Sequence, residues 1–490
     1  MRVSPLAVSI VALLLAAGCA DSGKAEKVAP PTVTAGAGIP SPAAQSGGTF
    51  SKEGWFGGAD GLHARLDVKS VQRQAGKTVL RYSVTSMDSS TKSVPSGIAL
   101  IDPVGRKLYK PTGATSGSDI APSTTREMAA EYPPIPAGVQ KVTAITPGTA
   151  GEFTGIPVTD AASSSPSASS TPTTPSSAPT SSTPSVGAEP FGRFTPVTPS
   201  PSPSSSTGPN PVDLYDIVEG ETKVVTSSQS EGTVSLHADV LFDGDSAKLS
   251  SRAKAVLDEA SQQMKAKATG ALTVEGHTSG DDTELSKERA DAVMKELKAR
   301  LGDGFTYTAT GKGDAEPVAK DAARNDRVEI SYQVKASARG NTSPASFRPE
   351  DGKTVATRTA SFGADKRRLE VKPFYRDGAY IVAVFDIVNE GPGTTPPDAS
   401  YPDPNYPGAV FGSFSIQTPG GKDVYRAVRV GPARPGGTGS PYVDPGRATF
   451  LTAVGKPDRG FVYLPAPPGN VTSVTFNAGP FGKVDKVPVS

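Results

Sequence analysis

A long stretch between residues 159 and 212 limits what the rest of the chain can fold into, because it consists mainly of serine, threonine and proline. It contains the runs SSSPSASSTPTTPSSAPTSSTPS and TPSPSPSSSTGPNP. Such a composition cannot bury a hydrophobic core and favours extended polyproline II conformations. We therefore expect residues 159–212 to be a disordered linker, and the segments on either side of it to fold separately.

Two further low-complexity stretches divide the 490-residue chain. Residues 19–50 are rich in alanine, glycine, proline and serine and are predicted to form a disordered tether, and residues 337–354 form a shorter linker. Three folded segments remain, at residues 51–158, 213–336 and 355–490, and the chain is long enough for three domains of ordinary size. The sequence therefore predicts a multidomain protein with long disordered linkers.

The N-terminus has the features of a secretory signal peptide. Arg2 supplies a positive charge, and the apolar run from Leu6 to Leu15 is too short to span a bilayer. Small residues then lead to Cys19, the only cysteine in the chain. This arrangement resembles a bacterial lipoprotein signal, which implies that residues 1–18 are removed and that Cys19 carries a lipid such as palmitate. The alternative is an ordinary secretory signal with an incidental cysteine.

Composition argues against several other functions. The formal net charge is +1 and the pI is about 7.7, so the chain lacks the basic excess that is typical of nucleic-acid binding. A single cysteine excludes a disulfide framework, and three histidines far apart in sequence do not suggest a zinc site. The sequence contains no nucleophile elbow and no HExxH motif. We therefore expect no metal, no cofactor and no enzymatic activity.

The first and last folded segments show patterns that are typical of β-strands. In LHARLDV, Leu62, Ala64, Leu66 and Val68 alternate with polar residues. The run YIVAVFDIV (380–388) is almost continuously apolar, as in a strand buried on both faces, and the RDG before it predicts a hairpin turn. Both segments are therefore predicted to be all-β.

The same two segments also resemble each other. YPPIPAGVQKVTAITPGTAGEFTGIPV (132–158) aligns with YLPAPPGNVTSVTFNAGPFGKVDKVPV (463–489), with shared tyrosine, proline and glycine positions at a constant offset. We interpret them as one β-sandwich module used twice, immunoglobulin-like in size and strand count.

The middle segment alternates predicted strands and helices. The strands are expected at residues 235–243, 271–278, 305–313 and 327–334, and the helices at residues 246–267 and 285–301. Both helices place apolar residues on one face, and Ser286 is a candidate N-cap for the second. This alternation predicts a compact α+β sandwich, with helices on one face of a small sheet.

Five motifs in this segment occur in an order that resembles a known family. They are VLFDGDSAKLSSRAKAVLDEA, TVEGHT, LSKERADAV, GKGDAEPVA and RNDRVEI. Residues 213–336 are thereby identified as similar to the OmpA-like C-terminal domains. The resemblance implies a central α+β domain that binds peptidoglycan non-covalently, by gripping the diaminopimelate of its stem peptide. The two related all-β segments that flank it lie outside the resemblance.

Diaminopimelate carries an ammonium and a carboxylate on one carbon, and the family pattern G-H-T-D…N-x-x-L-S-x-x-R-A supplies a partner for each. Arg289 matches the arginine, which would bind the carboxylate as a planar two-pronged donor. The family's aspartate would form an ion pair with the ammonium. In this chain its position, immediately after Thr278, is occupied by Ser279. The loop that follows is shorter than in the family and lacks the family asparagine.

Other positions keep part of the family pattern. Asn325 and Arg327 match the family's N-R-R-V-E-I block, and Asp326 replaces its central arginine. For the shortened loop, two interpretations stay open. Either Asp281 or Asp282 supplies the missing carboxylate, or the run SGDD is a solvated turn built from favoured turn residues.

Two single residues also allow more than one interpretation. Arg289 contacts the ligand, or it forms a surface ion pair with Asp282 or Glu284, worth under about 1 kcal/mol. His277 is expected to be a hydrogen-bonded polar residue at a strand end rather than a catalytic base.

Two functions follow from these patterns. In the first, the protein is anchored to the outer face of the cell membrane by its lipid, extends into the cell wall and binds peptidoglycan, so that it tethers membrane to wall. In the second, it is an envelope scaffold whose OmpA-like domain has lost peptidoglycan binding and whose β-sandwiches bind an unidentified protein partner. The Tyr/Pro-rich run at residues 396–414 is then a recognition loop, or else simply a long surface loop.

Overall fold

We analysed a computed structural model of the protein. It describes residues 50–56, 61–94, 97–114, 119–161, 211–318, 322–335, 342–396, 399–434, 439–445 and 453–490. The expected signal peptide, Cys19, and nearly all of the expected tether and Ser/Thr/Pro linker lie outside these residues. Within the described ranges, no helix is long and apolar enough to cross a membrane.

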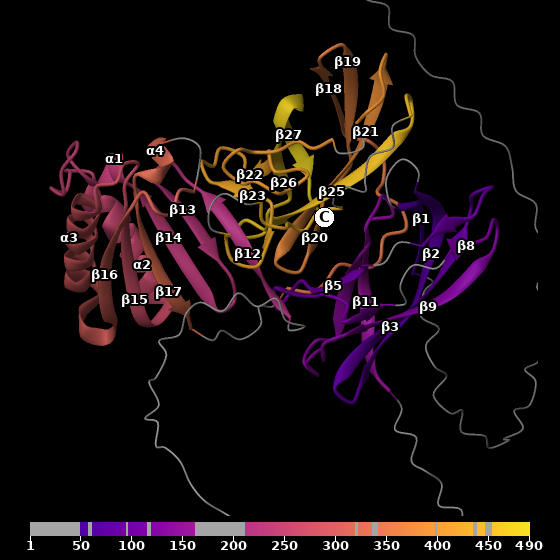
Figure 1. Cartoon of the computed structure of the whole chain (residues 1–490), viewed down its shortest axis with the longest axis horizontal. Helices are drawn as coiled ribbons and strands as arrows, with labels where there is room; N and C mark the ends of the chain where they lie inside the picture. Colours follow the sequence, from indigo (N-terminus) through magenta and orange to yellow (C-terminus); the bar gives the residue numbers. More distant parts are fainter. Residues whose placement is uncertain are drawn as a thin grey trace, which may run out of the picture. The chain divides into compact units, whose positions relative to one another are not determined.

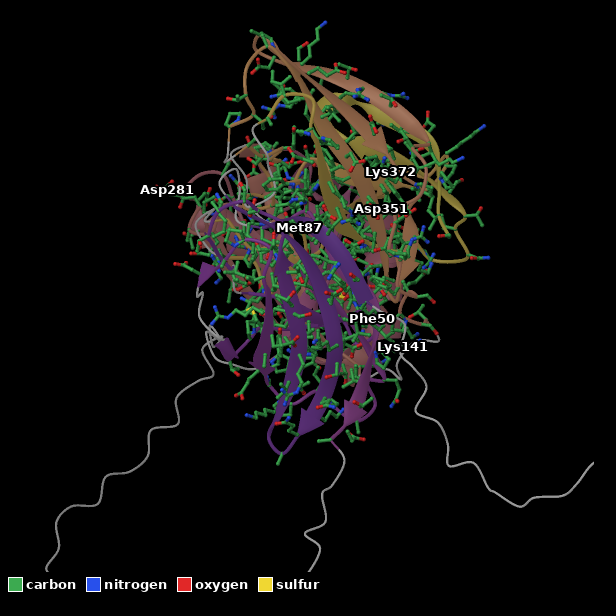
Figure 2. The ribbon with its side chains drawn as sticks, turned by 90° about the vertical axis from the view of Figure 1, so that its right-hand side faces the viewer. Phe50, Met87, Lys141, Asp281, Asp351 and Lys372 are labelled. Carbon is green, nitrogen blue, oxygen red and sulfur yellow. The ribbon has the colours of Figure 1, made fainter. Side chains whose placement is uncertain are left out.

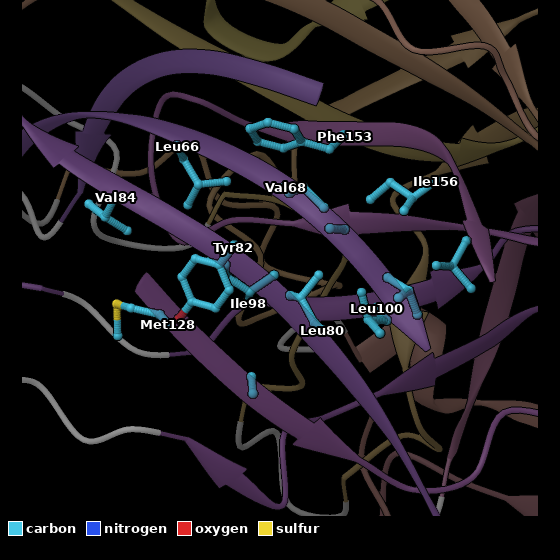
Figure 3. Close-up of a cluster of buried hydrophobic side chains, with 14 of the residues drawn as sticks. Leu66, Val68, Leu80, Tyr82, Val84, Ile98, Leu100, Met128, Phe153 and Ile156 are labelled. Atoms are coloured by element: carbon cyan, nitrogen blue, oxygen red, sulfur yellow. The ribbon is translucent and has the colours of Figure 1, made fainter. Parts of the chain in front are cut away.

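The N-terminal β-rich segment consists of two main sheets around one core (Figure 1). The predicted alternation of LHARLDV is confirmed, because Leu62, Ala64, Leu66 and Val68 are buried in one strand. Figure 3 shows Leu66 and Val68 among the buried side chains of this core. The strands are β1 (Phe50–Phe56), β2 (Leu62–Gln74), β3 (Lys77–Ser86), β4 (Lys92–Ser93), β5 (Ala99–Asp102), β6 (Lys107–Tyr109), β7 (Gly113–Ala114), β8 (Asp119–Ile120), β9 (Thr125–Tyr132), β10 (Lys141–Ile145) and β11 (Glu152–Asp160).

These strands pair mostly antiparallel. The first sheet joins β1, β2, β3, β9 and β7, and the second joins β6, β5, β10 and β11. The end of β11 crosses over and runs parallel to β2, with Val158 opposite Val71. Strand β11 therefore belongs to both sheets and closes one edge of the core.

The C-terminal β-rich segment also has two sheets around an apolar core, and aromatic rings dominate it. The Phe385 ring lies 5.1 Å from that of Phe414 and 4.9 Å from that of Phe411, measured between centroids. The predicted hairpin is confirmed, because Asp377 pairs with Tyr380 across the RDG turn. The strands are β18 (Ala356–Phe362), β19 (Asp365–Val371), β20 (Tyr375–Asp377), β21 (Tyr380–Gly391), β22 (Phe414–Gln417), β23 (Val424–Arg426), β24 (Arg429–Val430), β25 (Pro457–Pro465), β26 (Ser473–Ala478) and β27 (Lys483–Pro488).

The middle segment has the predicted α+β architecture, with its two long helices on one face of a mixed sheet (Figure 1). The sheet order is β12-β13-β14-β17-β15-β16, and only β15 and β16 are parallel. The strands are β12 (Val212–Glu219), β13 (Lys223–Ser227), β14 (Glu231–His237), β15 (Ala268–His277), β16 (Thr306–Gly313) and β17 (Arg327–Val334). The helices are α1 (Ala238–Leu241), α2 (Ala253–Lys267), α3 (Thr283–Leu301) and α4 (Ala322–Asn325).

Two predicted boundaries in this segment are wrong. The strand expected at 235–243 ends at His237, and the short helix α1 follows directly. The helix expected from residue 246 begins only at Ala253, whose backbone N–H donates to the Ser250 hydroxyl at 3.1 Å. The intervening turn carries apolar residues at helical spacing, so periodicity alone extended the helix too far.

Strand β12 contacts all three segments. Its start pairs with β6 (Val212 opposite Leu108), and its centre pairs with β24 (Tyr215 opposite Arg429). Its end pairs with β13 and with β23, where Val218 lies opposite Tyr425. The last residue of the expected Ser/Thr/Pro linker is therefore the first residue of a strand that is shared between sheets.

Residues 342–354, in the expected second linker, contain no strand but pack against both β-rich segments. The Phe347 ring lies 5.0 Å from that of Phe50 and 5.9 Å from that of Phe153. Arg459 donates to Asp351 at 2.8 Å and to the buried Glu152 at 2.7 Å. This stretch therefore adds apolar and charged contacts to the fold.

Candidate functional site

The candidate site lies where β15 ends and α3 begins. Gly276, the first residue of the GHT motif, sits so close to the helix that an added Cβ would lie 1.9 Å from the backbone oxygen of Ser286. The Thr278 backbone N–H donates to the Gly313 carbonyl at 3.0 Å, and its hydroxyl donates to the Gly280 carbonyl at 2.7 Å. The loop of residues 278–282 is thereby fixed against the end of β16.

The start of α3 differs from the sequence prediction. The N-cap is Asp282, whose carboxylate accepts the Leu285 backbone N–H at 2.8 Å, so the prediction of Ser286 as N-cap is wrong. Ser286 lies within the first turns, where its hydroxyl donates to the Thr283 carbonyl at 2.8 Å and accepts the Gly313 N–H at 3.1 Å. The shortened loop starts the helix earlier than the pattern of apolar residues suggested.

The two aspartates of the loop therefore differ in their surroundings. Asp282 is engaged at the helix N-terminus, where a negative charge is favourable. The Asp281 side chain is exposed at the surface of the molecule (Figure 2). Both residues are exposed.

Ser279, which stands where the family has aspartate, contacts the one residue of the RNDRVEI block that departs from the family. Its backbone N–H donates to Asp326 Oδ1 at 2.5 Å, and its hydroxyl lies 3.3 Å from Asp326 Oδ2. Asp326 is half-buried and follows Asn325, the last residue of α4. The two altered positions are thus direct neighbours, and together they keep one carboxylate at this edge.

Arg289 projects from α3 and is only 5% exposed. Its Nε donates to the Ser246 carbonyl at 3.1 Å and its Nη2 to the Gly244 carbonyl at 3.0 Å, while the guanidinium lies 5.1 Å from the centre of the Phe242 ring. In the described part of the chain it forms no ion pair, so the predicted alternative of a pair with Asp282 or Glu284 is wrong. Arg289 is therefore a buried cation held by neutral groups.

The other two predicted site residues lie beside the loop but bind within the protein. Arg327, opposite His277 on the neighbouring strand, donates from its three nitrogens to Glu329 (2.6 Å), the Asn325 carbonyl (3.2 Å) and the Glu316 carbonyl (3.0 Å). The Asn325 side chain accepts the Val318 N–H at 2.9 Å. Both residues hold the segment before β17 in position.

His277 is buried, and within the described residues neither ring nitrogen has a hydrogen-bond partner. The expectation of a hydrogen-bonded histidine is therefore wrong. Burial and the nearby Arg327 lower the pKa of His277 to about 4, so the ring is neutral at physiological pH.

His277 also belongs to a group that has the composition of a metal site. Potential ligand atoms of Glu275, His277 and Glu329 lie within 4.8 Å of one another. However, Lys312 lies 3.2 Å from the Glu275 carboxylate, and Arg327 pairs with Glu329. These cations already neutralise both carboxylates, so the group is poorly suited to a divalent ion.

The Tyr/Pro-rich run (396–414) packs against the chain itself over residues 399–414. Tyr401 and Tyr406 are buried, and the Tyr406 hydroxyl accepts a hydrogen bond from Arg324 of α4 at 3.1 Å. The run is therefore not a free surface loop, and its tyrosines contribute to internal contacts.

Comparison with known proteins assigns the class of the middle segment. Residues 241–331 match the OmpA family, and this segment is an OmpA family domain. Such domains are structural rather than catalytic, and for residues 241–331 this agrees with the prediction that the chain is not an enzyme.

Two curated relatives each match about a fifth of this chain. Outer membrane porin F of Pseudomonas aeruginosa is 34% identical over 114 residues, which is 21% of this chain and 33% of the relative. Outer membrane protein P5 of Haemophilus influenzae is 34% identical over 110 residues, which is 21% of this chain and 31% of the relative. The chain thus spans about a third of the length of these relatives. A solved structure, the cell wall anchor of the T6SS from Pseudomonas aeruginosa, is 28% identical, with 24% of this chain and 90% of that one covered and a TM-score of 0.22.

Sequence reasoning noted Asp326 as a departure from the family but did not give it a role. The available signal was that two positions differ from the family pattern in complementary ways, with serine in place of a carboxylate at 279 and a carboxylate in place of arginine at 326. Only the fold shows that these positions are in contact.

Proposed function

We propose that this protein is a cell-envelope lipoprotein that binds peptidoglycan non-covalently through its OmpA family domain and grips the diaminopimelate of the stem peptide. One observation carries the proposal: Arg289 is a buried arginine with no carboxylate partner among the described residues. A buried charge without a counter-ion is costly, and a bound carboxylate would offset that cost.

Arg289 has a donor left for this purpose. Nε and Nη2 donate to backbone carbonyls, and Nη1 makes no hydrogen bond within the described residues. The two carbonyl contacts and the Phe242 ring fix the plane of the guanidinium. A fixed guanidinium binds a carboxylate with less loss of side-chain entropy than a mobile one.

The ammonium of the ligand requires a carboxylate, and three aspartates lie along the same edge. The carboxylate of Asp326 accepts the backbone N–H and the hydroxyl of Ser279. An ionised carboxylate can accept about four hydrogen bonds, so Asp326 can still accept from the ammonium. Asp281 and Asp282 of the loop are exposed. We assign the principal role to Asp326, because its position is fixed, and a supporting electrostatic role to Asp281 and Asp282.

The remaining parts of the proposal concern anchoring and the flanking segments. Lipidation of Cys19 would hold the protein at the outer face of the cell membrane, and the Ser/Thr/Pro linker would give it reach into the wall. The β-rich segments are proposed to be two copies of one immunoglobulin-like module. Their order of strands supports this: β10 and β11 pair antiparallel in the first, and β26 and β27, at the aligned positions, pair antiparallel in the second.

The test is co-sedimentation of the purified protein with insoluble peptidoglycan. Peptidoglycan that carries diaminopimelate should retain the protein, and peptidoglycan that carries lysine should retain it poorly, because lysine lacks the second carboxylate. Arg289→Lys and Asp326→Asn should each weaken retention, by about tenfold for one lost charge-assisted contact. Arg300→Ala is the matched control, since Arg300 lies on the same helix and its ion-pair partners among the described residues are Asp258 and Glu296. Equal retention on both peptidoglycans would refute the proposed grip.

A second function is kept because of one observation. Ser279 donates to Asp326, and each nitrogen of Arg327 already donates to an acceptor of the protein, so fewer polar groups remain for a ligand at this edge. In that case the protein is an envelope scaffold without peptidoglycan binding. Co-purification of a protein partner through residues 355–490, with no retention on either peptidoglycan, would select this alternative.

A further inference from the structure

A cleft of about 310 Å³ lies on the face of the OmpA family sheet opposite the helices. One wall is formed by polar side chains of β12, β13, β14 and β17, including Thr233 and Ser235. The other wall comes from the C-terminal β-rich segment, including Tyr406, Arg429 and Tyr442. Small-molecule sites typically occupy concave spaces of about 300–1,000 Å³, so this cleft has the size of a ligand site.

Arg429 is the unusual residue of this cleft. It lies on β24 opposite Tyr215 of β12, and its side chain is only 9% exposed. Its Nε donates to the Gly431 carbonyl at 3.1 Å, and the guanidinium lies 5.4 Å from the centre of the Tyr215 ring. Over the described residues, no carboxylate forms an ion pair with it and its two terminal nitrogens donate no hydrogen bond. Burial lowers the pKa of Arg429, as expected for a desolvated cation.

Two other arginines that line the cleft have carboxylate partners, whereas Arg434 donates to the Gly439 carbonyl. Arg324 pairs with Glu219, and Arg327 pairs with Glu329. Glu231, which lines the facing wall, accepts a hydrogen bond from the Tyr215 hydroxyl and forms no ion pair with Arg429. The positive charge of Arg429 is therefore left uncompensated inside the cleft.

We propose that this cleft is a second binding site, which takes a small organic carboxylate and anchors it on the terminal nitrogens of Arg429. A guanidinium presents two parallel donors that match the two oxygens of a carboxylate. The Tyr215 ring fixes the plane of the guanidinium, and the Tyr442 side chain lines the same space. The site differs from the proposed peptidoglycan grip, because its anchor belongs to the C-terminal segment, and it does not depend on that function.

The carboxylate could belong to the end of a peptide or to an acidic sugar, and two probes distinguish these sources. N-acetylalanine represents the first and glucuronic acid the second, while N-acetylalanine amide is the neutral control. We expect saturation-transfer NMR with the full chain to detect a carboxylate probe at millimolar concentration but not the amide. The Tm of the protein should rise with the same probe, because ligand binding stabilises the folded state.

Variants locate the binding in the cleft. Arg429→Gln should weaken probe binding at least tenfold and abolish the rise in Tm, and Arg429→Lys should retain part of both. Arg358→Gln is the control for charge, since Arg358 is exposed on β18 and does not line the cleft. It should leave probe binding unchanged.

A second variant keeps the test decisive if Arg429→Gln does not fold. Ser235→Trp fills the cleft from the sheet side while Arg429 stays in place, and it should also prevent binding. The proposal is overturned if no carboxylate probe binds the unmodified protein, if the amide binds equally well, or if Ser235→Trp or a folded Arg429→Gln variant binds as the unmodified protein does.

Discussion

The backbone N–H of Ser279 donates a hydrogen bond to the carboxylate of Asp326 at 2.5 Å. These residues are 47 positions apart and belong to two different motifs of the OmpA family domain. Where the family pattern has aspartate and then arginine, this chain has serine and then aspartate. The carboxylate at this contact therefore belongs to the segment before β17 and not to the loop.

This contact predicts how the two positions respond to exchange. Ser279→Asp alone would bring two carboxylates together, and we expect it to lower the free energy of unfolding by about 1–2 kcal/mol near neutral pH. Adding Asp326→Asn should recover most of the loss, because one of the two charges is removed. Urea denaturation of both variants checks the expectation. Additive effects of the two changes would show that the side chains do not interact.

The close packing between β15 and α3 predicts that a side chain at Gly276 destabilises the fold. Gly276→Ala would place a methyl group 1.9 Å from the Ser286 backbone oxygen, and backbone cannot move aside cheaply. We expect the free energy of unfolding to fall by at least about 2 kcal/mol. Gly280→Ala is the control, because nothing lies within 4 Å of its added Cβ, and it should change stability by less than about 0.5 kcal/mol. Similar melting curves for the two variants would contradict the close approach.

Glu219, at the end of β12, carries a prediction for the contact with the C-terminal segment. It accepts Arg426 at 2.6 Å and Arg324 at 2.5 Å. Burial alone would raise the pKa of Glu219, but the two arginines outweigh burial and hold it below its usual range. Glu219→Gln should therefore cost about 1–3 kcal/mol near neutral pH.

The Glu219 effect has a matched control and a definite pH dependence. Glu221→Gln removes an exposed pair with Lys422 and should cost less than about 1 kcal/mol. Because the folded-state pKa of Glu219 is lowered, its contribution is present above the unfolded-state pKa and is lost as the pH falls through the folded-state value. The difference between wild type and Glu219→Gln in urea denaturation should therefore shrink in acid.

Asp377 predicts the opposite pH dependence. Its carboxylate is fully buried and accepts hydrogen bonds from Thr143 (2.8 Å), Tyr463 (2.9 Å) and the Ala345 N–H (2.8 Å). Burial raises the pKa of Asp377 from 3.8 to about 6, and the hydrogen bonds only partly oppose this shift. The folded state therefore holds a proton that the unfolded state releases, and this contribution to stability is lost as the pH rises through about 6.

The measurement compares wild type with Asp377→Asn at several pH values. Between about pH 4 and pH 7 the wild type should lose up to about 3 kcal/mol relative to the variant. Asn cannot ionise but keeps an acceptor for Ala345 and gains donors for the two hydroxyl groups. A constant difference across this range would mean that Asp377 does not titrate there.

Much of the fold could be predicted because local patterns agree with the tertiary structure. The apolar run that begins at Tyr380 became β21, and the second predicted helix became α3 within a few residues. The boundaries failed where side chains compete with periodicity. Asp282 rather than Ser286 caps α3, and the Ser250 hydroxyl accepts the first N–H of α2. These capping contacts set where the helices begin, and the spacing of apolar residues does not predict them.

The candidate site was predicted in part for the same reason. Family motifs located Arg289, Ser279 and the loop between them. They did not show that Arg289 is buried and donates to the Gly244 and Ser246 carbonyls. They also did not show that Asp326 accepts a hydrogen bond from Ser279. Those contacts join residues far apart in sequence, so spacing within a motif carries no information about them.

The sequence by itself determined the apolar patterns of the β-rich segments, the alternation that defines the OmpA family domain and the position of the candidate arginine, Arg289, since each depends on local spacing. Tertiary structure alone decided the distribution of charge. It placed a carboxylate at Asp326 beside Ser279, joined β12 to both β-rich segments, and left Arg429 buried without an ion-pair partner among the described residues. The physical reason is that burial and pairing of charges depend on which distant strands meet, and that is settled only when the chain packs.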